Sequence, residues 1–205
     1  MVQVLKVWAN NLMTLIFAVP EVFICSHNKF LSDEEFWKLP TSLFSISLQR
    51  REVTFIQTRD RVYEYDTRQH PMVSTVLKET ATLLYKVPLD GFLRYTDSVN
   101  TSKRWAVVLH HSYRCGSTLW AQVFNCLPGW RVLSECNYML APLIKSSDDI
   151  LSVVTSQLYR RAIVAGIRFF LSQVDEGTSV LIKTSFFDQY AIRVIAEEMP
   201  DVVLL

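Results

Sequence analysis

The sequence predicts an α/β protein in which helices flank a parallel sheet, and two observations lead to this expectation. From residue 104 onward, short apolar runs rich in β-branched residues alternate with amphipathic helical patterns, which is typical of parallel α/β construction. Of the 205 residues, 50% are apolar and 20% are charged, so the chain can bury a large core. The length suits one domain with a substantial extension, and we place the boundary between residues 1–103 and 104–205.

The pattern of residues 1–103 predicts an extension of α+β type, whose role is unknown. Ser32 and Glu35 have the spacing of a capping box, which predicts the start of a short helix. The alternating pattern from Glu52 to Tyr65 predicts a β-hairpin with a polar turn. Apolar residues at helical spacing predict a helix from Pro71 to Tyr85.

The apolar stretch Leu12–Cys25 is the one segment whose composition resembles that of a membrane anchor or a signal peptide. Pro20 and Glu21 interrupt it, and it is shorter than the roughly 20 apolar residues that a membrane helix needs. A docking helix is the expectation, with a membrane anchor or a signal-like element as the alternative. Asn100-Thr101-Ser102 is a formal N-glycosylation sequon, which matters only if the chain enters the secretory pathway.

The second half predicts strands and helices in alternation, and we expect this domain to be truncated at its C-terminus because it ends on a buried strand. The apolar runs predict strands over Trp105–His110, Arg131–Ser134, Ser179–Thr184 and Val202–Leu205. The amphipathic patterns predict helices over Ser117–Cys126, Asp148–Val174 and Gln189–Met199.

Charge and cysteine content exclude several classes of function. The chain has 21 basic and 20 acidic side chains and a net charge of +1, which disfavours a protein that coats nucleic acid. The adjacent His110 and His111 lack the spacing that lets two imidazoles on one helix bind zinc, and both read as strand-end residues. No metal site or disulfide framework is predicted, because the cysteines are few, irregularly spaced and without a CxxC pair: Cys25, Cys115, Cys126 and Cys136.

The loop between the first strand and the first helix of the second half predicts an anion site. Backbone N–H groups at a helix N-terminus have no intrahelical partners and lie at the positive end of the helix dipole. Gly116 permits a close turn, and Ser117 and Thr118 can donate hydroxyl hydrogen bonds to phosphate. Arg114 can add a fixed charge with bidentate geometry. The alternative for the two hydroxyl residues is ordinary helix capping.

The same loop lacks the residues that handle nucleoside triphosphates. The Walker pattern is GxxxxGK followed by Ser or Thr, but here His111 stands at the first glycine position and Ser117 replaces the lysine. Without that lysine no charge reaches the β- and γ-phosphates, so a P-loop kinase or NTPase is the least favoured alternative. A ligand with a lone 5′-phosphate group fits the loop better.

The segment Arg114–Thr118 resembles the 5′-phosphosulfate loop of the sulfotransferases that use 3′-phosphoadenosine 5′-phosphosulfate (PAPS). That loop has a basic residue, Ser or Thr, Gly and two further hydroxyl residues, and Cys115 departs from it. The resemblance covers residues 104–205 and is nearest to the carbohydrate and tyrosyl-protein branches. It implies a P-loop three-layer parallel sheet, transfer of a sulfuryl group without a metal, and PAPS binding by Arg114, Cys115, Gly116, Ser117 and Thr118.

The resemblance also implies catalytic roles for Glu135 and Lys183. Glu135 follows a short strand at the position of the family's general base, which takes a proton from the acceptor; the alternative is a surface or capping carboxylate. Lys183 ends a strand that resembles the family's third strand and would neutralise charge on the transferring group; the alternative is a solvated lysine. Arg114, Glu135 and Lys183 all fall near the carboxyl ends of predicted parallel strands, where open α/β sheets bind ligands.

A second hypothesis is a truncated, non-catalytic relative that acts as a nucleotide-binding or interaction module. In the resembling family, the arginine and serine that bind the 3′-phosphate follow the fourth strand, and the sequence stops at that strand. The acceptor is left open among carbohydrate, protein and small molecule, with no nucleic acid as a partner. The compartment is open as well, since the resembling family has members in the cytoplasm and in the Golgi lumen or membrane.

Overall fold

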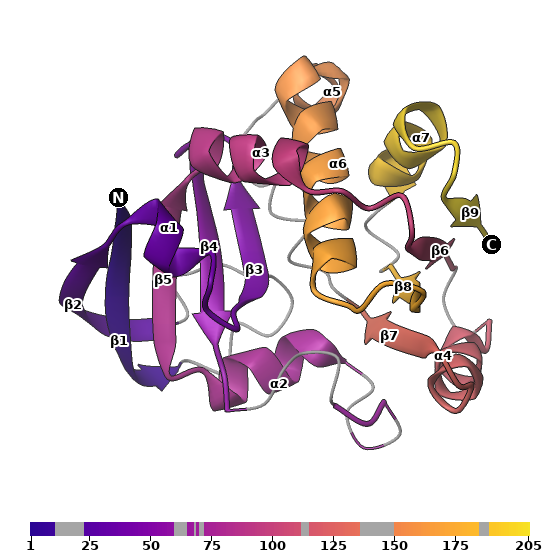
Figure 1. Ribbon diagram of the computed structural model, residues 1–205, viewed down its shortest axis with the longest axis horizontal. Helices are drawn as coiled ribbons and strands as arrows, with labels where there is room; N and C mark the ends of the chain where they lie inside the picture. The colour runs from indigo at the N-terminus through magenta and orange to yellow at the C-terminus, as the bar shows by residue number, and fades with distance from the viewer. Residues whose placement is uncertain are drawn as a thin grey trace.

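The fold consists of one antiparallel and one parallel sheet with helices between and around them (Figure 1). In Figure 1 the antiparallel sheet lies on the left and the parallel strands lie on the right, with helix α6 between the two. This computed structural model describes residues 1–10, 23–59, 65–67, 69, 72–111, 115–135, 150–184 and 189–205.

The antiparallel sheet has five strands in the order β2-β1-β5-β4-β3. Its strands are β1 (Val2–Asn10), β2 (Phe23–Leu31), β3 (Ser42–Ser47), β4 (Glu52–Gln57) and β5 (Leu83–Pro88). The helices of this half are α1 (Asp33–Phe36), α2 (Val73–Thr80) and α3 (Leu89–Ser98). The predicted capping box is confirmed, because Ser32 Oγ accepts from the Glu35 N–H at 3.2 Å and Glu35 Oε2 accepts from the Ser32 N–H at 2.8 Å.

The predicted hairpin within Glu52–Tyr65 is wrong. β4 pairs with β3 over Glu52–Ile56 on one side and with β5 over Glu52–Gln57 on the other, so neither edge is left for a following strand. The hairpin partner of β4 is therefore the preceding strand, β3, whose burial is nearly continuous rather than alternating. Residues 60–64 of the predicted second segment lie outside the described residues.

The predicted helix from Pro71 to Tyr85 is too long, because α2 ends at Thr80 and Leu84 and Tyr85 belong to β5. The apolar residues of β5 also satisfy helical spacing, but pairing with β1 and β4 on both edges makes the strand the better solution. The predicted docking helix Leu12–Cys25 is wrong at its end, because Phe23–Cys25 belong to strand β2; its residues 12–22 lie outside the described residues. Among the described helices, none is long and apolar enough to cross a bilayer.

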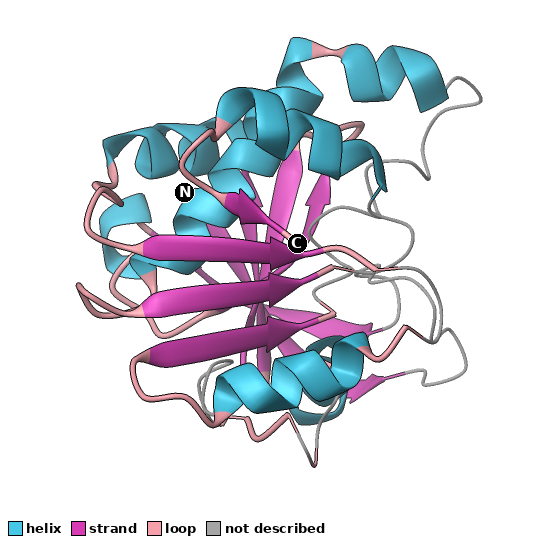
Figure 2. Cartoon of the chain, turned by 90° about the vertical axis from the view of Figure 1, so that its right-hand side faces the viewer, coloured by secondary structure: helices cyan, strands magenta, loops and turns pink. Residues whose placement is uncertain are grey.

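The parallel sheet has four strands in the order β7-β8-β6-β9, all running the same way (Figure 2). Its elements agree with the predictions apart from the long helix Asp148–Val174, which the structure divides at Ser156. Ser156 caps the second helix by accepting from the Tyr159 N–H at 3.1 Å. The elements are β6 (Trp105–Leu109), α4 (Ser117–Asn125), β7 (Trp130–Ser134), α5 (Ile150–Thr155), α6 (Gln157–Ser172), β8 (Ser179–Lys183), α7 (Gln189–Glu198) and β9 (Val203–Leu204).

Helices cover both faces of this sheet, as the alternation of its buried side chains requires. On one face Ala121 of α4 packs against Val107, Val132 and Leu181. On the other face α6 and α7 pack against the alternate positions of the same strands: Ala106, Val108, Leu133, Val180 and Ile182. The loops after the neighbouring strands β6 and β8 therefore lead to helices on opposite faces.

Helix α6 also belongs to the core of the antiparallel sheet. The ring of Phe169 on α6 lies 5.1 Å from that of Phe55 on β4 and 6.0 Å from that of Phe92 on α3. Contacts at these centroid distances are favourable aromatic pairs. Residues 1–103 and 104–205 therefore share one hydrophobic core.

Candidate functional site

Lys183, the last residue of β8, has only 1% of its side chain exposed. Its Nζ donates to Glu135 Oε1 at 2.5 Å and to Thr118 Oγ1 at 3.2 Å. A buried ammonium group needs such partners, because removal of its hydration is costly unless a counter-charge and hydrogen bonds replace it. Lys183 thus joins the ends of two parallel strands to the first turn of α4. We call Lys183, Glu135 and Thr118 the lysine cluster.

The hydrogen bonds of the lysine cluster leave two groups available for a ligand. Lysine only donates, so Thr118 Oγ1 is the acceptor and its own O–H can donate elsewhere. Glu135 is 19% exposed and uses Oε1 for the ion pair. Within the part of the chain that the structure describes, no donor contacts its second oxygen, Oε2. A carboxylate oxygen and a hydroxyl hydrogen therefore remain next to a buried positive charge.

The backbone at Glu135 is unusual, since its φ is +55°. Residues other than glycine rarely adopt this left-handed conformation, and such strain is concentrated at functional sites. The Glu135 N–H donates to the Lys183 carbonyl at 2.9 Å, which extends the pairing of β7 and β8 by one hydrogen bond. Both the backbone and the side chain of Glu135 are therefore held by Lys183.

The N-terminus of α4 has the features of an anion site. Gly116 is its N-cap residue, with φ of +84° and no side-chain hydrogen bond to the first turn. Ser117 is buried, and the oxygen of Thr118 is engaged by Lys183, so neither side chain caps the helix. Among the described residues no side chain caps the N–H groups of Ser117 and Thr118, whereas the Leu119 N–H donates to the Gly116 carbonyl at 2.9 Å.

His110 and Thr184 form a second polar contact at the same edge of the sheet, which the sequence analysis missed. His110 Nδ1 lies 3.0 Å from Thr184 Oγ1. Burial and the nearby His111 lower the pKa of His110 below its ordinary value, which favours the neutral imidazole at pH 7. Each residue ends a predicted strand, but they become neighbours only because Leu109 pairs with Lys183, and the sequence does not give that pairing.

Of the two predicted loop residues before Gly116, the structure describes Cys115 but not Arg114. Cys115 is exposed and carries a free thiol directly before Gly116. Among the residues that the structure describes, no group of three His, Cys, Asp or Glu side chains could hold a metal ion.

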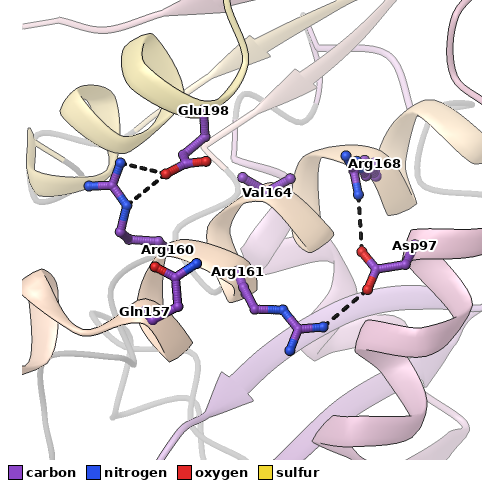
Figure 3. A pocket seen from close by; sticks show the side chains of 7 residues that line it. All are labelled: Asp97, Gln157, Arg160, Arg161, Val164, Arg168 and Glu198. Atoms are coloured by element: carbon purple, nitrogen blue, oxygen red, sulfur yellow. Dashed lines mark hydrogen bonds and ion pairs between the residues drawn. The ribbon is translucent and has the colours of Figure 1, made fainter.

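A groove along α6 shares no residue with the lysine cluster, and its arginines are paired (Figure 3). Arg161 and Arg168 donate to Asp97 of α3 at 3.0 and 3.1 Å. Arg160 donates to Glu198 of α7 at 2.6 and 2.8 Å. These ion pairs connect α3 and α7 to α6 and engage all three arginines of the groove, so we assign it a structural role.

The lysine cluster combines a buried ammonium, a hydroxyl donor, a helix N-terminus and a carboxylate whose second oxygen has no donor among the described residues. Such a set can bind an anion at α4 and accept a proton at the carboxylate. The chain matches no protein-family model, no curated protein and no solved structure. Its function is therefore inferred from the chemistry of these residues.

Proposed function

We propose that the chain is a sulfotransferase-like protein of the P-loop three-layer type, which binds PAPS and transfers its sulfuryl group to an acceptor hydroxyl or amine. The observation that supports this most is the position of Lys183, whose Nζ contacts both Thr118 and Glu135. One buried cation thus connects a residue of the proposed phosphosulfate loop with the proposed general base.

The arrangement of the parallel sheet supports a ligand at this place. The adjacent strands β6 and β8 are followed by helices on opposite faces, α4 on one and α7 on the other. Open α/β sheets bind their ligands in the crevice between such strands, at the carboxyl edge. Lys183 ends β8, and the loop that leads to α4 follows β6, so both border this crevice.

The donor set fits a phosphate or sulfate group. Gly116 places the start of α4 in a left-handed turn, and the first-turn N–H groups, the Thr118 hydroxyl and the Lys183 ammonium are all donors. Anions prefer such a set, since charge-assisted hydrogen bonds to phosphate oxygens are short and strong. In the proposal, Arg114 and Cys115 complete the loop on its N-terminal side.

The residues divide the chemistry of transfer between them. PAPS supplies a sulfuryl group activated by its anhydride bond to phosphate. Thr118 and the first turn of α4 hold the anionic oxygens, and Lys183 offsets the charge that grows on the bridging oxygen as its bond to sulfur breaks. Glu135 Oε2 accepts the proton that the acceptor loses as its oxygen or nitrogen bonds to sulfur. The product 3′-phosphoadenosine 5′-phosphate leaves, and no redox change is needed.

Calorimetric titration with 3′-phosphoadenosine 5′-phosphate tests the nucleotide site. We expect the chain to bind it, and K183M to weaken binding by about tenfold or more, since hydrogen bonds to a charged group contribute about 1.5–3 kcal/mol. K103M is the matched control, because Lys103 is an exposed lysine paired with Glu176. Equal affinity in K183M and the parent chain would place the phosphate elsewhere, and binding of ATP with magnesium alone would favour a P-loop kinase or NTPase.

The proposed base requires a separate measurement, which can use water as the acceptor. Release of 3′-phosphoadenosine 5′-phosphate from PAPS reports slow transfer of the sulfuryl group to water. E135Q should reduce release far more than it reduces binding, whereas E176Q, at an exposed glutamate, should change neither. Binding without any release in the parent chain would favour the non-catalytic nucleotide-binding relative.

A further inference from the structure

The turn between α3 and β6 carries the one Asn-X-Ser/Thr sequence of the chain, Asn100-Thr101-Ser102. Asn100 and Ser102 are exposed. Ser102 donates to Asn100 Oδ1 twice, from its hydroxyl at 2.7 Å and from its backbone N–H at 3.0 Å. The asparagine side chain is therefore held in one orientation by the third residue of its own sequon.

These contacts leave the amide nitrogen of Asn100 available. Both hydrogen bonds go to Oδ1, and among the described residues no acceptor binds Nδ2. The Ser102 hydroxyl, as a donor to the amide oxygen, polarises the amide group on which a glycosyl transfer must act. Asn100 is thus an exposed acceptor amide of the Asn-X-Ser/Thr type whose nitrogen has no hydrogen-bond partner among the described residues, as a surface glycosylation site needs.

We propose that Asn100 is a site of N-linked glycosylation, and that the chain is translocated into the compartment where this modification takes place. In the reaction, the Asn100 Nδ2–C1 bond forms as the bond between C1 and the diphosphate of a lipid-linked oligosaccharide breaks. The amide nitrogen loses a proton, and the lipid diphosphate is the leaving group. The inference does not depend on the proposed sulfotransferase function.

Asn100 is exposed on the turn that leads into the amino end of β6. Arg104 fixes the backbone of the turn by donating from Nη1 to the Asn100 carbonyl at 2.8 Å and from Nε to the Val174 carbonyl at 2.9 Å. The turn precedes β6, whereas the lysine cluster lies beyond the opposite end of the sheet. Four steps along a strand span roughly 13 Å, so a glycan at Asn100 leaves the carboxyl edge open.

Translation of the full chain in the presence of microsomes tests the proposal. We expect one shift to lower gel mobility, removed by an amidase that releases N-glycans and converts Asn100 to Asp, which peptide mass spectrometry reads at that position. N100Q and S102A should abolish the shift. S102T and T101A should keep it, because each preserves the asparagine and a hydroxyl at the third position of the sequon.

Three results would overturn the proposal. A translocated, protease-protected chain without the shift would show that Asn100 is not modified, and a chain left outside the microsomes would refute the required translocation. A shift that persists in N100Q would place the modification elsewhere. Nucleotide binding is measured on chain produced in bacteria, which carries no such glycan, so the two proposals fail independently.

Discussion

Removal of either charge of the Lys183–Glu135 pair should destabilise the fold, and by unequal amounts. Loss of one partner from a buried ion pair costs about 3–5 kcal/mol, because the other charge is left without compensation. E135Q strands an ammonium that is 1% exposed, so we expect about 4 kcal/mol. K183M strands a carboxylate that is 19% exposed and that water can reach, so we expect about 2.5 kcal/mol.

The double variant K183M/E135Q tests whether these costs arise from the pair itself. It leaves neither charge buried, so we expect about 3.5 kcal/mol rather than the sum of about 6.5, a coupling of about 3 kcal/mol. Urea unfolding followed by tryptophan fluorescence gives the four free energies of unfolding. The exposed pair Lys103–Glu176 is the matched control, for which each single variant should cost about 0–1 kcal/mol. Additive costs in the K183M/E135Q cycle would refute the argument.

Three further predictions follow from single positions. G116A and G177A both place a Cβ in open space, at φ of +84° and +80°. Each should lower the free energy of unfolding by about 1 kcal/mol in thermal unfolding. Only G116A should also weaken binding of 3′-phosphoadenosine 5′-phosphate. Burial and His111 lower the pKa of His110 in the folded chain, so the unfolded chain binds the proton more readily. The free energy of unfolding should therefore fall as the pH drops below about 6.5. In urea unfolding at different pH values, H110Q should flatten this part of the profile of midpoints. F169A should cost about 3–5 kcal/mol, and far-UV and near-UV circular dichroism should still report one transition, because its ring contacts both β4 and α3.

The second half of the fold could be predicted from sequence because its signals are local and agree with one another. Trp105–Leu109 is a short apolar run, Ser117–Asn125 follows a glycine, and Gln189–Glu198 ends just before Met199 and Pro200. A strand buried on both faces needs no partner to be recognised from its composition. The break at Ser156 was missed because apolar spacing continues across it, and only the cap formed by its hydroxyl separates α5 from α6.

The first half was less predictable because its strands depend on distant partners. β1 has register shifts at Val4/Leu5 and Val7/Ala9, which break the alternation that would mark it as a strand. Leu84 and Tyr85 satisfy a helical period, and only pairing with β1 and β4 decides in favour of β5. These choices are made by tertiary hydrogen bonds, which a local pattern does not contain.

For the site, the sequence could indicate the edge of the sheet but not the contacts made there. Glu135 and Lys183 were placed at the carboxyl ends of their strands, and the structure puts them there, although their roles in catalysis stay predictions. The contact of Lys183 with Thr118 depends on how α4 packs against the sheet, and the contact of His110 with Thr184 depends on the pairing of β6 with β8. Neither separation can be derived from positions along the chain.

The conformation of Glu135 is the strongest argument that the ion pair serves more than stability. Ser134 pairs with Lys183 in the ladder, so in a regular strand the next residue would lie on the opposite face from Lys183. The left-handed φ of +55° breaks this alternation and brings the carboxylate to the lysine, at a cost of about 1–2 kcal/mol for a residue with a Cβ. A purely structural partner for Lys183 could be supplied from the ladder without that strain. A carboxylate held at the carboxyl edge of a parallel sheet in spite of this cost supports the proposed role of Glu135 in acting on a ligand.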